Sequence, residues 1–142
     1  MSLWRVPVAL DALNGRTAGN LLGHLGIVYT EVGPDYLMGT MPVDARTVQP
    51  AGILHGGASV VLAETLGSTA AALVVDEKTS FCVGQNISAN HLRVVRNGLV
   101  TGRAEPLHLG GRSQVWEIRI VEERGRLVCV ARLTMAVLER RD

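Results

Sequence analysis

Aromatic residues are scarce in this 142-residue sequence and make up 4% of it. Hydrophobic residues as a whole reach 47%, so the chain can build a core, and that core must be largely aliphatic. We therefore expect strands rich in valine, isoleucine and leucine. A chain of this length is most simply one domain, and we predict a single domain over residues 1–142.

An excess of either charge is also missing. The chain has 14 lysines and arginines against 13 aspartates and glutamates, which gives a formal net charge of +1. This balance, and the lack of a basic stripe with interleaved aromatics, argue against a nucleic-acid partner. Several arginines gather in mid-chain, where a solvated face and a local anion site both stay open as interpretations: Arg93, Arg96, Arg103 and Arg112.

The sequence contains only two cysteines, and its N-terminus has no long apolar run. Cys82 and Cys129 both fall in apolar, strand-like runs, which favours free buried thiols over a disulfide. The first residues, Met-Ser-Leu-Trp-Arg-Val-Pro, do not resemble a signal peptide, and we expect no segment to span a bilayer. We therefore predict a cytoplasmic protein without a membrane partner.

Two helices and six strand-like segments can be distinguished along the chain. We expect helices over residues 10–22 and about 57–75, and strands over 24–31, 36–43, 80–95 (one strand, or two joined by a kink), 99–107, 113–122 and 127–138. Asn97-Gly98 is a two-residue hairpin signal, and 109–111 and 123–125 are further tight turns. Short hairpins imply an antiparallel sheet. One such sheet curved around a single long helix gives an α+β fold.

The long helix carries one residue that is out of place. Residues 56–75 are apolar or small on nearly every side, and Glu64 is their only ionisable group. An enclosed carboxylate has to be paired or used, because burial of an unpaired one is costly. Ser68 lies one turn beyond Glu64 on the same face, and free amides mark the helix start at Gly57. A structural role stays open, in which Ser68 bonds to the Glu64 carbonyl and Glu64 pairs with a buried arginine.

Other catalytic patterns are weak or absent. The four histidines show no metal-ligand spacing, no cysteine joins them, and no G-x-S-x-G elbow is present, so we expect neither a metal nor a cofactor. The turn 109–113 contains two glycines, Arg112 and Ser113, and is compatible with a phosphate cradle or with a plain hairpin turn.

The segment Gln49-Pro-Ala-Gly-Ile-Leu-His-Gly-Gly-Ala58, followed by a helix that carries Glu64, resembles the hotdog-fold acyl-CoA thioesterases. The similarity spans about residues 10–138 and includes Met-Pro-Val-Asp at 41–44, Asn-His at 90–91 and Pro-Leu-His-Leu-Gly at 106–110. It is strongest to the branch that contains dihydroxynaphthoyl-CoA, enterobactin-proofreading and 4-hydroxybenzoyl-CoA thioesterases. The resemblance implies a hotdog fold, in which the curved sheet wraps the helix.

Carried over to this chain, the resemblance implies a role for each matching residue. Glu64 would be the nucleophile or the general base, and the Gly56 N–H would polarise the thioester carbonyl. His55 and Gln49 would position the reacting groups, and Ser68 would orient the water or the intermediate. The implied substrate-binding residues are His91 in the acyl pocket and Gly84, Arg93, Arg112 and Ser113 at the CoA moiety.

The implied activity is hydrolysis of an acyl-CoA to the free acid and CoA without a cofactor. Many relatives have aspartate at the acid position, so Glu64 favours aroyl thioesters such as benzoyl- or hydroxynaphthoyl-CoA; many also have asparagine where this chain has Gln49. The family implies a homodimer or a homotetramer built as a dimer of dimers, with sites at the interface. The alternatives are a hotdog hydratase or dehydratase, whose signatures are absent here, and a non-catalytic acyl-CoA-binding module in which Glu64 is structural.

Overall fold

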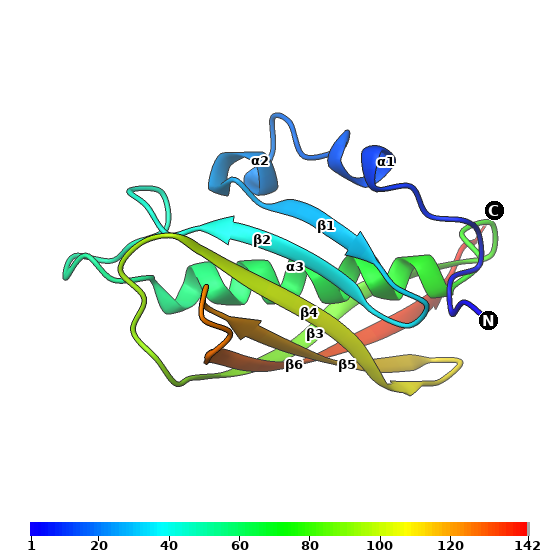
Figure 1. Cartoon of the computed structure of the whole chain (residues 1–142). Coiled ribbons are helices and arrows are strands. Elements are labelled where there is room, and N and C mark those ends of the chain that lie inside the picture. The colour runs from blue at the N-terminus through cyan, green and yellow to red at the C-terminus, as the bar shows by residue number, and fades with distance from the viewer. Residues whose placement is uncertain (142) are drawn as a thin grey trace.

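A six-stranded antiparallel sheet curls along one side of a long helix, as Figure 1 shows. The computed structural model describes residues 1–141. The helices are α1 (Leu10–Asn14), α2 (Leu21–Leu25) and α3 (Gly56–Val74). The strands are β1 (Val28–Val32), β2 (Leu37–Pro42), β3 (Ser80–His91), β4 (Leu99–Leu109), β5 (Ser113–Val121) and β6 (Leu127–Glu139). The predicted α+β class and the antiparallel sheet around one long helix are confirmed.

The strand order is β1-β2-β4-β5-β6-β3, so β3 forms one edge of the sheet. It pairs only with β6 among the described residues, from Ser80 opposite Glu139 to His91 opposite Cys129. Of the two alternatives predicted for residues 80–95, the structure has one strand, with a register shift between Gly84 and Asn86, and this strand ends at His91. One side of this twelve-residue strand therefore has no strand partner within the described chain.

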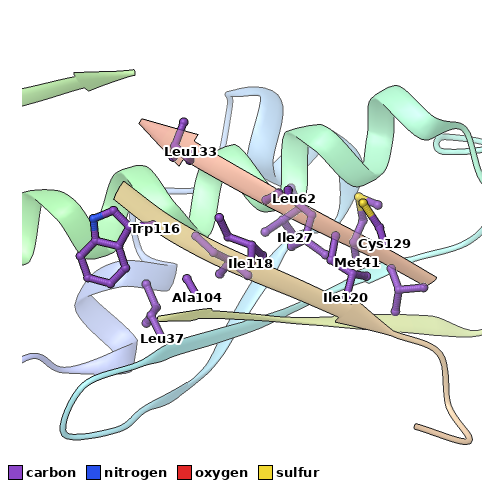
Figure 2. Close-up of a cluster of buried hydrophobic side chains, with 14 of the residues drawn as sticks. Ile27, Leu37, Met41, Leu62, Ala104, Trp116, Ile118, Ile120, Cys129 and Leu133 are labelled. Carbon is purple, nitrogen blue, oxygen red and sulfur yellow. The ribbon is translucent and has the colours of Figure 1, made fainter. Parts of the chain in front are cut away.

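The core lies between the sheet and α3 and is mainly aliphatic, as the composition predicts. Trp116, Ile118 and Ile120 alternate along β5 on the side that faces the helix, and all three are fully buried. Figure 2 shows them in one layer with Leu62 of α3. Period-two alternation on the strand and helical spacing on α3 thus place one face of each element in the same core.

Helix α3 is long and apolar enough to cross a membrane by length and composition, but half of that span is buried inside this fold. The sheet covers one side of the helix, including the fully buried Leu66. The opposite side is open: Gly57 is exposed, and Val61, Glu64 and Ser68 are half-buried. The expectation of an enclosed helix is therefore wrong for the single chain, because one face has no cover.

The N-terminal half differs from the prediction of one helix over residues 10–22. It forms the two short helices α1 and α2, because Gly19 adopts a positive φ of 77° and Asn20 then caps a new helix by accepting the Leu22 N–H. Helix α2 extends to Leu25 and ends at a left-handed Gly26, so the first strand begins at Val28 and not at residue 24.

The expected hairpin at Asn97-Gly98 is also wrong. Gly98 does turn the chain, with φ of 82°, but β3 and β4 lie at different places in the sheet and do not pair. The segment between them crosses the end of the sheet, where Val95 and Gly98 accept hydrogen bonds from the N–H groups of Leu54 and Val43. The turns predicted at 109–111 and 123–125 do join paired strands, and in the structure they span 110–112 and 122–126.

The C-terminal end of α3 is closed by distant parts of the chain. Its last carbonyls need external partners, and the Leu73 carbonyl accepts the Arg5 N–H at 3.0 Å. Trp4 stacks on Trp116 with ring centroids 6.5 Å apart and donates from Nε1 to the Gly33 carbonyl at 2.7 Å. The N-terminal segment thus covers the core at this end of the molecule.

Candidate active site

The loop before α3 is held in a fixed shape by its own backbone. Gln49 accepts the Gly52 N–H and donates to the Ile53 carbonyl, and Gly52 takes the positive φ of 75° that this tight turn needs. The Gln49 side chain accepts a hydrogen bond from the Ala51 N–H. The His55 N–H donates to the Thr47 carbonyl at 2.8 Å, so the loop delivers His55 directly to the helix start.

His55 is the N-cap of α3. Its Nδ1 accepts the Gly57 N–H at 2.8 Å, so a neutral ring carries its proton on Nε2. The His55 carbonyl accepts the N–H groups of Ala58 and Ser59. The remaining amide of this turn belongs to Gly56, and among residues 1–141 no acceptor is found for it. One N–H at the positive end of the helix dipole is therefore available to a carbonyl oxygen or an oxyanion.

A pocket of about 410 Å³ opens beside this amide. Gly56 forms part of its wall and touches His91: a Cβ at Gly56 would lie 2.9 Å from the His91 Nε2. Gln49 and Arg93 complete the predicted residues in the pocket, whose lining is Gln49, Ile53, Leu54, Gly56, Ser59, His91, Leu92, Arg93, Val94 and Val128. The structure thus brings four of the sequence-predicted residues together around the Gly56 N–H.

Glu64 lies elsewhere, on the open side of α3. Its Oε1 accepts a hydrogen bond from the Ser68 hydroxyl at 3.4 Å, and Ser68 also contacts the Met135 sulfur at 3.7 Å. Gly84 of β3 packs directly on the carboxylate, because a Cβ at this position would collide with Oε1. Among residues 1–141 no salt bridge involves Glu64. Within these residues, Glu64 therefore does not pair with a buried arginine, as the structural role considered above would require. The carboxylate is half-buried and faces outward beside β3.

The predicted site residues therefore form two groups within one chain. The first is the pocket group, which we define as Gln49, His55, Gly56, His91 and Arg93. The second is the acid group, which we define as Glu64, Ser68 and Gly84. The two groups sit at different levels of α3 and β3, and within one chain they do not share the pocket of the first group.

Arg112 and Ser113 are far from the pocket. They end the turn between β4 and β5, where the Arg112 carbonyl accepts the Val137 N–H. Figure 1 shows this turn at the end of the molecule that also holds both termini, opposite the loop before α3 and the turn between β5 and β6. Arg112 is exposed, and the Gly110 N–H donates to the Ser113 carbonyl at 2.8 Å, as in an ordinary hairpin. In the single chain, Arg93 and Arg112 cannot hold the same phosphate.

Sequence reasoning missed one polar residue of the pocket. Ser59 is 1% exposed, lies on α3 three residues after Gly56, and lines the pocket wall. The available signal was its spacing, since residues three apart in a helix share a face with the predicted oxyanion amide. Within residues 1–141 no group of three potential metal ligands is found.

Burial and hydrogen bonding shift the pKa values of ionisable groups near the site. Burial raises the pKa of the Cys82 thiol, which lies on β3 and points its sulfur at the Ala71 carbonyl. The side-chain hydrogen bond from Arg46 lowers the pKa of Asp44 at the start of the loop, and the two groups are 2.7 Å apart. Asp44 therefore stays ionised and helps hold the loop.

Comparison with known proteins agrees with this geometry. The family model described as thioesterase superfamily matches residues 51–129. The 1,4-dihydroxy-2-naphthoyl-CoA hydrolase of Escherichia coli is 52% identical over 96% of this chain and 99% of its own length. The proofreading thioesterase EntH of Cronobacter sakazakii is 52% identical over 96% and 98%.

Solved structures give the same result for the fold. A thioesterase from Haemophilus influenzae superposes with a TM-score of 0.93 at 49% identity, over 96% of this chain and 95% of that one. A variant of a Pseudomonas aeruginosa thioesterase gives 0.96 at 47% identity, over 98% and 100%. The predicted resemblance is confirmed: this chain is a hotdog-fold enzyme that belongs to the thioesterase superfamily.

Proposed function

We propose that this enzyme hydrolyses acyl-CoA thioesters with an aromatic acyl group, such as benzoyl- or hydroxynaphthoyl-CoA. The observation that carries the proposal is the free Gly56 N–H beside an apolar pocket, together with an unpaired carboxylate on the same helix. The relatives named for naphthoyl-CoA hydrolysis and for proofreading support the substrate class. The residues 1–142 would act as one catalytic domain.

In the proposed reaction the carbonyl oxygen of the thioester accepts the Gly56 N–H, which stabilises the oxyanion as it forms. Glu64 takes a proton from water while the water oxygen bonds to the carbonyl carbon. The C–S bond then breaks, and the CoA sulfur leaves with the proton from Glu64. In the alternative route Glu64 attacks the carbonyl carbon, and the C–S bond breaks as CoA leaves as the thiolate. Water then hydrolyses the resulting anhydride, which regenerates Glu64 and releases the free acid, and the CoA thiolate takes up the proton that the water gives up. His55 and Gln49 position the thioester, and Ser68 orients Glu64.

The length of α3 supports a site shared between two copies of the chain. Eight residues separate Gly56 from Glu64, which is about 12 Å along a helix at 1.5 Å per residue. The Glu64 carboxylate accepts the hydroxyl of Ser68, which lies one turn further from the helix start. A donor and a nucleophile on one carbonyl lie only about 6–7 Å apart, since each is roughly 3 Å from its atom. Glu64 would therefore act on a thioester held by the Gly56 N–H of a partner subunit.

Strand β3 offers a way to bring the two groups together. Gly84 belongs to the acid group and His91 to the pocket group, and seven residues of strand separate them by about 23 Å. If β3 pairs antiparallel with β3 of a second copy, with Gly84 opposite the partner's His91, each Glu64 approaches the partner's pocket. The same pairing moves the partner's Arg112 and Ser113 toward Arg93, so that both could contact one CoA.

The composition of β3 supports this pairing. Exposed edge strands are usually protected by proline, lysine or other charges, and Ser80–His91 contains no proline, lysine, arginine, aspartate or glutamate. The strand also exposes Phe81 and Val83 on its outer side. We propose a dimer through β3 as the functional unit, which could pair again into a tetramer. We place it in the cytoplasm, where its two free cysteines would stay reduced.

The test is release of free thiol from benzoyl-CoA, hydroxynaphthoyl-CoA and lauroyl-CoA by the unchanged enzyme and by Glu64→Ala. We expect turnover by the unchanged enzyme, faster for the aromatic esters, and a loss of about a thousandfold or more in the variant. Glu77→Ala removes an exposed carboxylate just beyond the same helix and should leave the rate unchanged. No hydrolysis of any ester would refute the proposal and direct attention to hydration of enoyl-CoA or to binding alone.

A further inference from the structure

The pocket beside Gly56 contains a buried hydroxyl with no protein partner. Ser59 is 1% exposed, and no hydrogen bond of its Oγ is found within residues 1–141. No side-chain polar atom in this part of the chain is both sealed from solvent and unsatisfied, so the Ser59 oxygen meets the space inside the pocket. A buried hydroxyl in this state is available to a bound molecule.

Half of the residues around this hydroxyl are aliphatic. Ile53, Leu54, Leu92, Val94 and Val128 are five of the ten lining residues, and the volume of about 410 Å³ lies in the range of small-molecule pockets. Such walls suit the faces of an aromatic ring.

Ser59 also lies at a suitable depth below the reacting group. It follows Gly56 by three residues on the same face of α3, which separates the two positions by about 5–6 Å. An acyl group whose carbonyl oxygen accepts the Gly56 N–H can therefore extend a ring along this face, with a ring substituent close to Ser59.

We propose that Ser59 is a specificity-determining residue that hydrogen-bonds a hydroxyl group on the aromatic ring of the acyl moiety. The enzyme would then prefer hydroxylated aroyl-CoA esters over the unsubstituted ester. This inference rests on the proposed function, because it assumes that the thioester carbonyl binds at Gly56. Ser59 takes no part in the bond-breaking step.

The test compares binding of benzoyl-CoA with that of 2-, 3- and 4-hydroxybenzoyl-CoA by calorimetry. Glu64→Ala serves as the parent, so that the esters are not consumed, and Glu64→Ala/Ser59→Ala as the variant. Alanine is the better helix former, so the variant should fold, and unchanged circular dichroism checks this. Thr65→Val in the same parent is the matched control, because Thr65 is another buried residue of α3 that does not line the pocket.

We expect the tightest-binding hydroxybenzoyl ester to bind about three- to tenfold more weakly after Ser59→Ala, as for loss of one neutral hydrogen bond. Binding of benzoyl-CoA should stay within twofold, and Thr65→Val should change neither ester. Equal weakening of all four esters would place Ser59 on the CoA arm and overturn the inference, as would no change for any of them. Because the readout is binding, failure here is distinct from absence of hydrolysis, which would refute the proposed function.

Discussion

Two residues of one helix carry most of the proposed chemistry, and their surroundings differ. The Gly56 N–H is the first amide of α3 and remains without an acceptor in the described chain. Glu64 has a single hydrogen-bond donor, Ser68, and no cationic partner among residues 1–141. A carboxylate used only for structure would be expected to have a cation or several donors beside it. The residues therefore favour the catalytic interpretation of Glu64.

The contact between Gly84 and Glu64 leads to a prediction at residue scale. Gly84→Ala places a Cβ where the Glu64 Oε1 now lies, so the carboxylate must move. We expect kcat to fall by about tenfold or more, because small displacements of a catalytic group are costly. Ser88→Ala, on the same strand but away from Glu64, is the control. Thiol release measures both variants, and a fully active Gly84→Ala would show that the carboxylate position is not critical.

The two thiols give a prediction about reactivity. Burial raises the pKa of Cys82 and of Cys129, so at pH 8 both thiols stay mostly protonated and little reactive thiolate is present. We expect iodoacetamide to modify native Cys82 about tenfold more slowly than free cysteine and Cys129 more slowly still. Mass spectrometry of timed samples, with guanidinium-unfolded protein as the control, checks this. Rapid labelling of the native protein would contradict the burial of these residues.

At the scale of helices and strands, the sequence patterns predicted those features that depend on neighbouring residues, such as strand alternation and short turns. The alternation in residues 113–122 and the turns at 110–112 and 122–126 lie where the sequence places them, because adjacent strands pair across short connections. The Asn97-Gly98 signal specified a positive φ but not a strand pair, and long-range pairing moved β3 to the far edge beside β6. Sequence periodicity does not carry that information.

The site was predictable to a similar degree. The His55-Gly56 motif and the helical spacing to Glu64 and Ser68 predict which groups take part in the proposed chemistry. They do not show that Gln49, in the loop before α3, and Arg93 share a pocket with Gly56, or that Ser59 lines this pocket. Both facts depend on the path of the segment that connects β3 to β4. They also leave open which face of α3 the sheet covers.

The N-terminal segment provides a prediction for element packing. Trp4 stacks on the fully buried Trp116 and bonds to the turn between β1 and β2. Trp4→Ala should lower the free energy of unfolding by about 1–3 kcal/mol, since Trp4 is only half-buried. Urea denaturation measures the change, and Trp4→Phe should recover part of it. An unchanged midpoint for Trp4→Ala would show that the segment does not cover the core in solution.

The turn between β5 and β6 gives a prediction for pH dependence. The side-chain hydrogen bond from Arg126 lowers the pKa of Glu122 from 4.5 to about 2. A depressed carboxyl pKa contributes stability above the unfolded value, and that contribution disappears as the pH falls from about 4.5 to about 2. We expect Glu122→Gln to lower Tm at pH 7, with a smaller difference from the unchanged protein at pH 3. A difference in Tm that does not depend on pH would contradict this assignment, and Glu77→Gln is the control.

At the scale of the whole molecule, the pocket group and the acid group lie at different levels of the fold. The pocket group surrounds the start of α3. The acid group lies near the middle of α3, where Gly84 of β3 packs on the Glu64 carboxylate. The open face of α3 and the uncharged β3 edge lie on the acid group's side. A two-fold axis at β3 would complete two identical sites, each with Gly56 from one subunit and Glu64 from the other.

The shared site is tested most directly by mixing two inactive variants. Glu64→Ala removes the acid, and Gly56→Pro removes the amide donor at a helix position that tolerates proline. Gly56→Ala retains the N–H and controls for the added Cβ, which would meet His91. The two inactive chains are co-expressed with different tags, and the mixed assembly is purified through both.

A mixed dimer built as proposed has one site with both lesions and one site with none. We predict that the mixed dimer hydrolyses an aroyl-CoA at about half the rate of the unchanged dimer, while each parent variant stays nearly inactive. A mixed dimer as inactive as its parents would show that Gly56 and Glu64 must come from the same chain, and would contradict the shared site.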